Sequence, residues 1–244
     1  MIGLPPHIQA CLFDLDGVLT STTRLHIGAW KQAFDDFLRK RAEETGDDLY
    51  PFDPAADYTR YVDGRRRADG VRTFLASRGI ELPEGDPADA PGMGTVNALG
   101  NLKNTIVVAH MDTEGVDERP GARAYLQAAE KAGLRRVVVS SSANAAKALA
   151  LTGLDRLIEA RVDGVVARER DLPGKPDPAT FLYGAELAGV DPASAAVFED
   201  AVAGVQAGRA GAFGFVVGID DAGQADALRE AGADIVVPDL GALL

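Results

Sequence analysis

The sequence predicts an α/β protein in which a Rossmann-like, doubly wound parallel sheet carries an inserted α-helical cap. Two observations predict the sheet: the chain opens with a short apolar run, Ile8 to Leu12, and apolar runs alternate with helical periodicity from about residue 119 onward. A third observation predicts the insertion, because residues 22–112 show helical periodicity and little strand character. We therefore expect a core of residues 1–21 and 113–244 and an inserted cap domain of residues 22–112.

The core elements follow from this alternation. Ile8 to Leu12 is apolar apart from Gln9, as expected for a parallel strand covered on both faces. The turn residues Arg119-Pro120-Gly121 then mark the return of the chain to the core. The expected helices are Ala122 to Ala132, Ala145 to Leu151, Pro178 to Ala188 and Val202 to Ala210. The expected strands are Arg136 to Val139, Ala195 to Phe198, Phe213 to Val217 and Asp234 to Val237.

The inserted region reads as several amphipathic helices. Trp30, Phe34 and Phe37 recur at helical spacing and are followed by a polar, acidic stretch from about Glu43 to Asp57. Further helical patterns begin at Tyr58, Val71 and Val96, with turn-rich residues from Pro83 to Gly94 before the last of them. The linkers at 20–23 and 111–117 should act as hinges, with His110, Asp112 and Glu114 as hinge residues rather than a metal site.

Composition excludes several classes of partner. The chain has 244 residues with 37 acidic against 25 basic residues, a formal net charge of −12 that argues against nucleic acid and anionic membranes as partners. Its single cysteine, Cys11, lies in the first apolar run and fits a small core residue. The lack of a disulfide framework, a signal peptide and a membrane span favours the cytoplasm. We expect a monomer.

Two carboxylates follow the first apolar run. Asp14 and Asp16 come where the strand ends, and ligands of open α/β sheets bind beyond the carboxyl ends of their strands. Residues two apart on a strand share one side, so the two acids can address one reacting centre, while Gly17 lets the backbone turn away. The structural alternative is an Asp pair that stabilises a turn.

Polar groups also follow later parts of the core. Ser140 to Asn144 follow a strand and lead into a helix N-terminus, which suits an anion or a simple helix cap. Glu199 and Asp200 end another strand and suit Mg2+ or again a cap. Lys175 lies in a proline-rich loop, where a fixed cation could neutralise carboxylate and phosphate charge; a solvated turn lysine is the ordinary alternative. Four such groups in this order favour one joint site.

This set of motifs resembles the haloacid dehalogenase superfamily of phosphotransferases over nearly the whole chain. The resemblance implies that Asp14 is a nucleophile forming an aspartyl-phosphate and that Asp16 is the general acid/base. It also implies that Lys175 orders the nucleophile and the phosphoryl group, which the Ser140 position binds. The implied Mg2+ ligands are Asp14, the backbone carbonyl of Asp16, Glu199 and Asp200. The implied substrate-binding residues of this loop are Ser141, Ser142, Ala143 and Asn144.

The cap residues resemble the β-phosphoglucomutase-like family. The resemblance rests on Thr22, His26 and Trp30, which follow the Asp-x-Asp motif at similar offsets. It implies that His26 is a hinge partner of the general acid/base, with a purely structural hinge hydrogen bond as the alternative. It implies that Trp30 faces the substrate, with a place in the cap core as the alternative. Gly64 to Arg67 resembles that family's Gly-x-x-Arg loop, and the resemblance implies that Arg67 binds the phosphate that is not transferred. A guanidinium suits this task because it binds phosphate bidentately, and a solvated helix face is the alternative for these arginines. The other implied substrate-binding residues of the cap are Gly64, Arg65 and Lys103.

The resemblance implies a Mg2+-dependent enzyme that interconverts β-D-glucose 1-phosphate and glucose 6-phosphate through glucose 1,6-bisphosphate. The alternatives are a sugar-phosphate phosphatase with the same parts and, in another class, a non-catalytic phosphosugar-binding or regulatory protein. Two residues depart from the family: Ala143 replaces a lysine of the phosphate loop, and Ser21 replaces an acid. The expected partner is a small phosphorylated sugar.

Overall fold

In the computed structural model, which describes residues 2–46, 50–220 and 223–244, the first strand pairs with two strands from the second half of the chain. The chain divides into two units. The core unit comprises Met1–Thr22 and Val116–Leu244, and the cap unit comprises Thr23–Gly115. These bounds start the cap at residue 23, against 22 expected from the sequence, and end it at 115, against 112. Each unit is described by itself.

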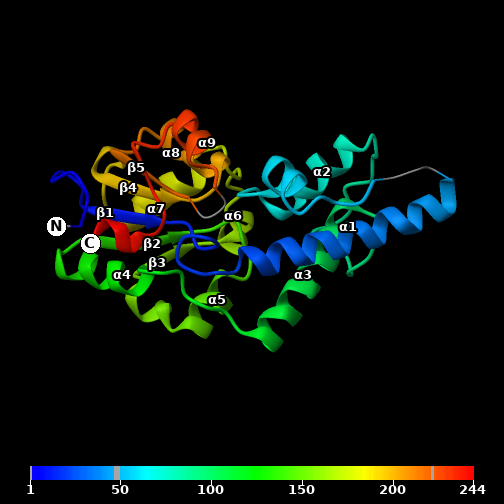
Figure 1. Cartoon of the computed structure of the whole chain (residues 1–244), viewed down its shortest axis with the longest axis horizontal. Coiled ribbons are helices and arrows are strands. Elements are labelled where there is room, and N and C mark those ends of the chain that lie inside the picture. Colours follow the sequence, from blue (N-terminus) through cyan, green and yellow to red (C-terminus); the bar gives the residue numbers. More distant parts are fainter. Residues whose placement is uncertain (1, 47–49, 221–222) are drawn as a thin grey trace. The chain divides into compact units, whose positions relative to one another are not determined.

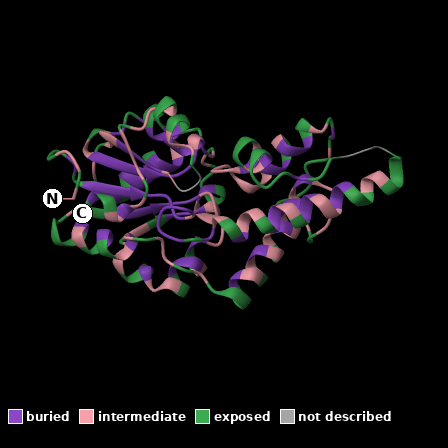
Figure 2. Cartoon of the chain, in the orientation of Figure 1, coloured by how far each residue is buried: buried purple, intermediate pink, exposed green. Residues whose placement is uncertain are grey.

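The core unit is built on a six-stranded sheet in the order β3-β2-β1-β4-β5-β6, with every neighbouring pair parallel. The strands are β1 (Ala10–Phe13), β2 (Arg135–Val139), β3 (Ala160–Val162), β4 (Ala195–Glu199), β5 (Phe215–Ile219) and β6 (Ile235–Val237). The register puts Phe13 beside Val138 and Phe198, so the residues that follow β1, β2 and β4 meet at one edge of the sheet. Every residue of β1 and β4 is buried, as expected of inner strands covered on both faces (Figure 2).

Helices cover both faces of this sheet (Figure 1). On one face α4 and α5 pack with the C-terminal 3₁₀ turn against alternate residues such as Phe13 and Phe198, whose rings stack 4.6 Å apart. On the other face α7, α8 and α9 pack against the intervening residues, Leu12 and Val197 among them. The core helices are α4 (Ala122–Lys131), α5 (Ala145–Thr152), α6 (Gly164–Glu169), α7 (Ala179–Ala188), α8 (Val202–Ala210) and α9 (Ala225–Ala231), with 3₁₀ turns at Leu154–Leu157, Pro192–Ser194 and Leu240–Leu243.

The described residues of the cap unit form helices joined by loops, and none of them lies in a strand. Its helices are α1 (Thr23–Thr45), a π-helical turn (Tyr58–Val62), α2 (Arg67–Ser77) and α3 (Val96–Glu114). They enclose an aromatic cluster in which the Phe34 ring stacks on Phe74 at 4.0 Å and on Trp30 at 4.9 Å. Because α1 and α3 contribute to the same cluster, the cap has a hydrophobic core of its own. Residues 47–49 of the acidic stretch lie outside the described residues.

The predicted fold class is confirmed, with corrections to single elements. The strand expected at Phe213 to Val217 lies two residues later, because Phe213 turns into the helical layer and packs edge-on against Phe181 at 6.0 Å. Strand β3 and helices α6 and α9 were not predicted, since each is too short to show a period. The expected linker from residue 111 is helical as far as Glu114. Among the described residues, no helix combines the length and apolarity needed to span a membrane.

Candidate active site

Lys175 lies at the centre of the core unit's polar cluster. Its ammonium donates to Asp14 Oδ1 and to Glu199 Oε1, each at 2.5 Å, and to the backbone carbonyl of Val139 at 3.1 Å. All three charged side chains are buried. The contacts join the ends of β1, β2 and β4, which the parallel register brings together. The structure thus brings together the predicted Asp14, Lys175 and Glu199.

The charges of this cluster do not balance. Burial, reinforced by the neighbouring carboxylates, raises the pKa of Asp14 and of Glu199 above their ordinary values, although Lys175 opposes the rise. Burial works against the charge on Lys175, but the two carboxylates outweigh it and hold the pKa of its ammonium above the usual range. Lys175 is therefore protonated, and it is shared between two acids.

A divalent cation fits the same place. Carboxylate oxygens of Asp14, Glu199 and Asp200 all lie within 4.8 Å of one another, and all three residues are buried. Lys175 supplies one positive charge against these three acids, so a second cation would relieve the repulsion among them. An all-oxygen ligand set suits a hard cation such as Mg2+. Asp14, Glu199 and Asp200 are the residues that could hold it.

Two further groups fix the Glu199 carboxylate. The backbone N–H of Ala201 donates to Glu199 Oε2 at 3.0 Å, which leaves Oε1 for Lys175. Gly204, in the first turn of α8, lies so close that a Cβ on it would overlap the Glu199 carboxylate. Gly204 was not predicted as a site residue; its position five residues after Glu199, on the helix that follows the acid, was the available signal.

A threonine pair holds Asp16. The hydroxyl of Thr22 donates to Asp16 Oδ1. The single hydrogen of Thr20 Oγ1 is therefore shared between Thr22 Oγ1 at 2.9 Å and the carbonyl of Leu15 at 3.1 Å. Both threonines are fully buried. Gly17, at φ +89°, makes the tight turn between Asp16 and Thr20 that its lack of a Cβ allows. The predicted Thr22 therefore orients Asp16, and Thr20, which was not predicted, anchors Thr22.

The Ser140 to Asn144 loop is held by its own hydroxyls. Ser140 Oγ accepts from the backbone N–H of Ser142 at 3.0 Å, and Ser142 Oγ accepts from that of Asn144 at 3.1 Å. These are local turn bonds rather than helix caps, because Asn144, the N-cap residue of α5, makes no side-chain cap bond. Each of them leaves the serine hydroxyl hydrogen available as a donor. Gly164 supports the loop from beneath: its N–H donates to the Ser142 carbonyl, and a Cβ there would press on Ser141 and Ala143.

In the cap unit the structure brings together three predicted residues. Lys103 Nζ lies 2.9 Å from His26 Nδ1 and 4.7 Å from the centre of the Trp30 ring. Burial of the ring and, to a lesser extent, the Lys103 charge lower the pKa of His26 well below its ordinary value. Since a lysine ammonium only donates, His26 is neutral and accepts through Nδ1, so its proton is on Nε2. Trp30 is buried in the aromatic cluster, which agrees with the cap-core alternative.

The Gly-x-x-Arg segment joins the π-helical turn to α2. Gly64 has φ +68°, the Arg65 N–H donates to the Val62 carbonyl at 3.2 Å, and Arg67 is the first residue of α2. The stem of Arg67 crosses α3 at Gly100, where a Cβ would lie 3.2 Å from Arg67 Cγ. Gly100 therefore gives the predicted phosphate-binding arginine its path across the neighbouring helix.

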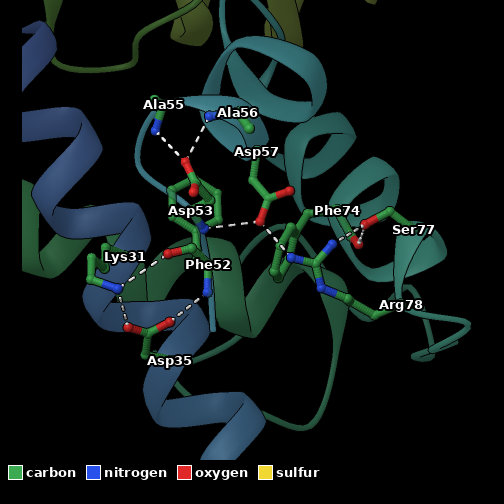
Figure 3. Close-up of polar contacts among 10 residues, drawn as sticks. All are labelled: Lys31, Asp35, Phe52, Asp53, Ala55, Ala56, Asp57, Phe74, Ser77 and Arg78. Carbon is green, nitrogen blue, oxygen red and sulfur yellow. Dashed lines mark hydrogen bonds and ion pairs between the residues drawn. The ribbon is translucent and has the colours of Figure 1, made fainter. Parts of the chain in front are cut away.

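A polar clamp fixes the chain just before this segment (Figure 3). The buried Asp57 accepts from Arg78, at the end of α2, and from the backbone N–H of Asp53 at 2.9 Å. Asp35 on α1 accepts from the Phe52 N–H at 2.8 Å, and Lys31 donates to the Phe52 carbonyl at 3.1 Å. Residues 52–57 are thereby tied to α1 and α2.

The prediction of hinge residues near the second junction needs a correction. His110, Asp112 and Glu114 lie in α3 rather than in a linker. His110 Nδ1 is 2.7 Å from Glu114 Oε1, one helical turn away, and Arg24 donates to Glu114 Oε2 at 3.0 Å. Since Arg24 and Glu114 lie near opposite ends of the inserted sequence, this contact joins the beginning of α1 to the end of α3.

A parallel α/β sheet with an Asp-x-Asp motif after β1, a buried lysine and an acidic pair after β4 defines a class of phosphotransferases. Residues 8–211 match the haloacid dehalogenase-like hydrolase family, and the chain belongs to it, among its β-phosphoglucomutase-like members. A β-phosphoglucomutase of Mycobacterium tuberculosis is 56% identical over the whole of this chain and 94% of its own length.

Other relatives include phosphatases. Hexitol phosphatase A of Escherichia coli is 30% identical over 82% of this chain and 77% of its own length. Among solved structures, β-phosphoglucomutase from Clostridium difficile superposes with a TM-score of 0.74 over 97% of this chain and 93% of its own; at 24% identity this likeness shows the shared fold.

Proposed function

We propose that this protein is a Mg2+-dependent β-phosphoglucomutase, which interconverts β-D-glucose 1-phosphate and glucose 6-phosphate. The observation that carries the proposal is the buried Lys175, which is shared between Asp14 and Glu199. Such an arrangement suits a carboxylate nucleophile, which a binding protein does not need. The full-length similarity to a mycobacterial β-phosphoglucomutase supports this choice of reaction. The cap unit acts as the substrate-specificity domain.

Asp14 carries the phosphoryl group between the two positions of the sugar. In the phosphorylated enzyme, the C6 hydroxyl oxygen of β-glucose 1-phosphate attacks phosphorus, and the bond from phosphorus to Asp14 Oδ breaks. The glucose 1,6-bisphosphate formed turns round in the site. A carboxylate oxygen of Asp14 then attacks the C1 phosphoryl group, and the sugar leaves as glucose 6-phosphate. Lys175 holds Asp14 and neutralises charge that spreads over the phosphoryl oxygens.

Asp16 moves the proton in both half-reactions. Its carboxylate takes the proton of the attacking C6 hydroxyl and returns it to the C1 oxygen as the second bond to phosphorus breaks. The hydrogen bond from Thr22 Oγ1 to Asp16 Oδ1 orients the Asp16 carboxylate for this exchange. The Thr20 to Thr22 contact fixes that orientation from behind.

When bound, Mg2+ supplies positive charge to the phosphoryl oxygens and suppresses repulsion between the carboxylate nucleophile and the phosphate. Asp14, Glu199, Asp200 and the backbone carbonyl of Asp16 are its proposed ligands. Donors of the Ser140 to Asn144 loop bind the phosphoryl group during transfer. The second phosphate and the sugar are assigned to the cap residues, which are His26, Trp30, Gly64, Arg65, Arg67 and Lys103.

A sugar-phosphate phosphatase is the second candidate, supported by the similarity to hexitol phosphatase A. It would use the same Asp14 chemistry, with water in place of the sugar hydroxyl as acceptor. Closure of the cap over a bound sugar would exclude water. Whether the sugar hydroxyl or water accepts the phosphoryl group therefore decides between the two functions. We further propose a cytoplasmic monomer acting on a small phosphorylated sugar, without nucleic acid or membrane as partner; the net charge of −12 and the lone, buried Cys11 support this setting.

One assay separates these functions. The protein is incubated with Mg2+, β-glucose 1-phosphate and a trace of glucose 1,6-bisphosphate, and glucose 6-phosphate and free phosphate are measured in parallel. Glucose 6-phosphate in large excess is expected of the mutase, whereas mostly free phosphate would establish the phosphatase. Asp14→Asn, which keeps the size of the side chain, should abolish either activity. No turnover of any phosphate ester by the wild type would favour the non-catalytic binding protein.

A further inference from the structure

We infer that Gln224 is a positioning residue for the metal-binding carboxylates of the core unit. Gln224 lies at the start of α9, after β5, and its side-chain Nε2 donates to the backbone carbonyl of Asp200 at 2.8 Å. Strand β5 pairs with β4 in parallel, with Glu199 beside Gly218, so the segments that follow the two strands leave the same edge of the sheet. The inference rests on the proposed role of Glu199 and Asp200 as Mg2+ ligands.

The contact acts through a single peptide group. The Asp200 carbonyl that accepts from Gln224 belongs to the same planar unit as the Ala201 N–H, which points the opposite way in a trans peptide. That N–H donates to Glu199 Oε2 at 3.0 Å, while Glu199 Oε1 accepts from Lys175. A chain of hydrogen bonds thus runs from Gln224 through the peptide to Glu199 and on to Lys175 and Asp14. Donation to the carbonyl also polarises the peptide and strengthens its N–H as a donor.

The Gln224 side chain serves Asp200 rather than its own helix. It occupies the N-cap position of α9 but makes no side-chain cap bond there. Instead its backbone N–H donates to Asp220 Oδ1 at 2.6 Å, which fixes the residue while its amide reaches the Asp200 carbonyl. The amide orientation is determined, because an oxygen facing the carbonyl could not form a hydrogen bond.

The amide leaves one group unsatisfied. Gln224 Oε1 is buried and has no hydrogen-bond partner among the residues that the structure describes. A buried acceptor without a partner costs free energy, which the contact from Nε2 to the Asp200 carbonyl has to outweigh. The geometry therefore favours a role in holding the peptide between Asp200 and Ala201, and with it the two acids that flank the metal position.

The test measures metal binding without substrate. Gln224→Met keeps the length of the side chain and removes its N–H, and Gln206→Met changes an exposed glutamine on α8 as the matched control. Mg2+ affinity is read by competition with Mn2+, whose free concentration is followed by electron paramagnetic resonance. Thermal melting in EDTA reports damage unrelated to the metal. Where the methionine variant fails to fold, Gln224→Ala replaces it.

We expect the Mg2+ dissociation constant of Gln224→Met to rise about tenfold, with melting in EDTA as in the wild type, since partners behind metal ligands commonly contribute 10- to 100-fold to affinity. Gln206→Met should bind Mg2+ as the wild type does. An unchanged dissociation constant overturns the inference. A weakened affinity also overturns it if the variant melts at a lower temperature than the wild type in EDTA, because the loss then reflects damage unrelated to the metal. Because no substrate is present, these outcomes are independent of the choice between mutase and phosphatase; absence of Mg2+ binding in the wild type would instead refute the metal assignment itself.

Discussion

The Lys175 ammonium lies 2.5 Å from Asp14 Oδ1 in a site where both side chains are almost fully buried, at 1% and 9% exposure. The same ammonium is 2.5 Å from Glu199 Oε1, so a single buried cation is shared between two carboxylates. In such surroundings a missing partner leaves the remaining charges without compensation by solvent. Lys175 is therefore as much a requirement of folding as of the proposed phosphoryl transfer.

Lys175→Met should lower the free energy of unfolding in EDTA by about 3 kcal/mol, because it leaves Asp14 and Glu199 buried without their cation. Added Mg2+ should stabilise this variant more than the wild type, since the metal then supplies the missing positive charge. Urea denaturation with and without Mg2+ measures both effects. Lys131→Met, at the exposed end of α4, is the control and should change stability little. Equal stabilisation of wild type and Lys175→Met by Mg2+ would contradict this account.

Gly204→Ala should cut turnover strongly, because the new Cβ would overlap the Glu199 carboxylate and force it away from Lys175. The stability should also fall, by about 1 to 3 kcal/mol, as is usual for overpacking in a filled interior. Gly28→Ala is the matched control: it lies in α1 with no heavy atom within 4 Å of the added Cβ, and should stabilise by about 0.5 to 1 kcal/mol. Steady-state kinetics and urea denaturation test both. Full activity in Gly204→Ala would show that Glu199 tolerates displacement.

Arg67→Ala should raise KM for β-glucose 1-phosphate and increase the share of free phosphate among the products, because the cap loses its proposed grip on the second phosphate. Gly100→Ala should shift both quantities in the same direction but less, since its Cβ would press on the Arg67 stem at 3.2 Å. The ratio of glucose 6-phosphate to free phosphate is the measurement. If that ratio stays at the wild-type value in Arg67→Ala, the assignment of this arginine is wrong.

Asp57→Ala should lower the free energy of unfolding by about 2 to 4 kcal/mol, because it leaves the Arg78 guanidinium and the Asp53 N–H without their shared acceptor (Figure 3). The pair is shielded, with exposures of 16% for Arg78 and 11% for Asp57. Asp226→Ala breaks an open pair on α9, where Asp226 is 94% exposed, and should cost at most about 0.5 kcal/mol. Urea denaturation compares the two variants, and similar losses in both would contradict the clamp.

His26 should make the protein less stable as the pH falls. The pKa of His26 is lowered in the folded state, so below its ordinary value of 6.5 the unfolded chain binds a proton that the folded chain does not. The free energy of unfolding therefore decreases through this residue by up to about 1.4 kcal/mol per pH unit below that value, until the folded pKa is reached. Unfolding of the wild type and His26→Gln at pH 7.5, 6.5 and 5.5 isolates this contribution. A difference between the two that does not vary with pH would refute it.

Periodicity predicted most of the fold correctly because the long elements carry clear patterns. The helix over Val202–Ala210 is confirmed in full, and the buried run at β1 was recognised from its continuous apolar residues. The three-residue strand β3 was missed because Arg161 interrupts its apolar residues. The shift of β5 by two residues could not be read locally, since it depends on Phe213 packing against Phe181, a contact between residues far apart in the chain.

Site residues were predictable where a polar side chain comes at the end of a strand. They were not predictable where a contact depends on how distant parts of the chain pack. Asp14 and Glu199 could be proposed together because the ends of parallel strands converge at one edge. Lys175 was proposed from the proline-rich loop in which it lies, between α6 and α7. The contact between His26 and Lys103 joins residues 77 apart in the chain, so no local pattern shows it. Gln224 gave no signal either, because a single amide in a polar segment looks like any surface glutamine.

The position of β1 in the middle of the sheet has a consequence for synthesis of the chain. The strand that leads to Asp14 is made before its two partners, β2 and β4, which end at residues 139 and 199. The cap unit, by contrast, is one uninterrupted segment with its own core and is finished at residue 115. As the ribosome moves along the message, β1 must remain without its final neighbours until most of the polypeptide has emerged. Asp14, the proposed nucleophile, is thus the first part of the site to be translated and among the last to be enclosed.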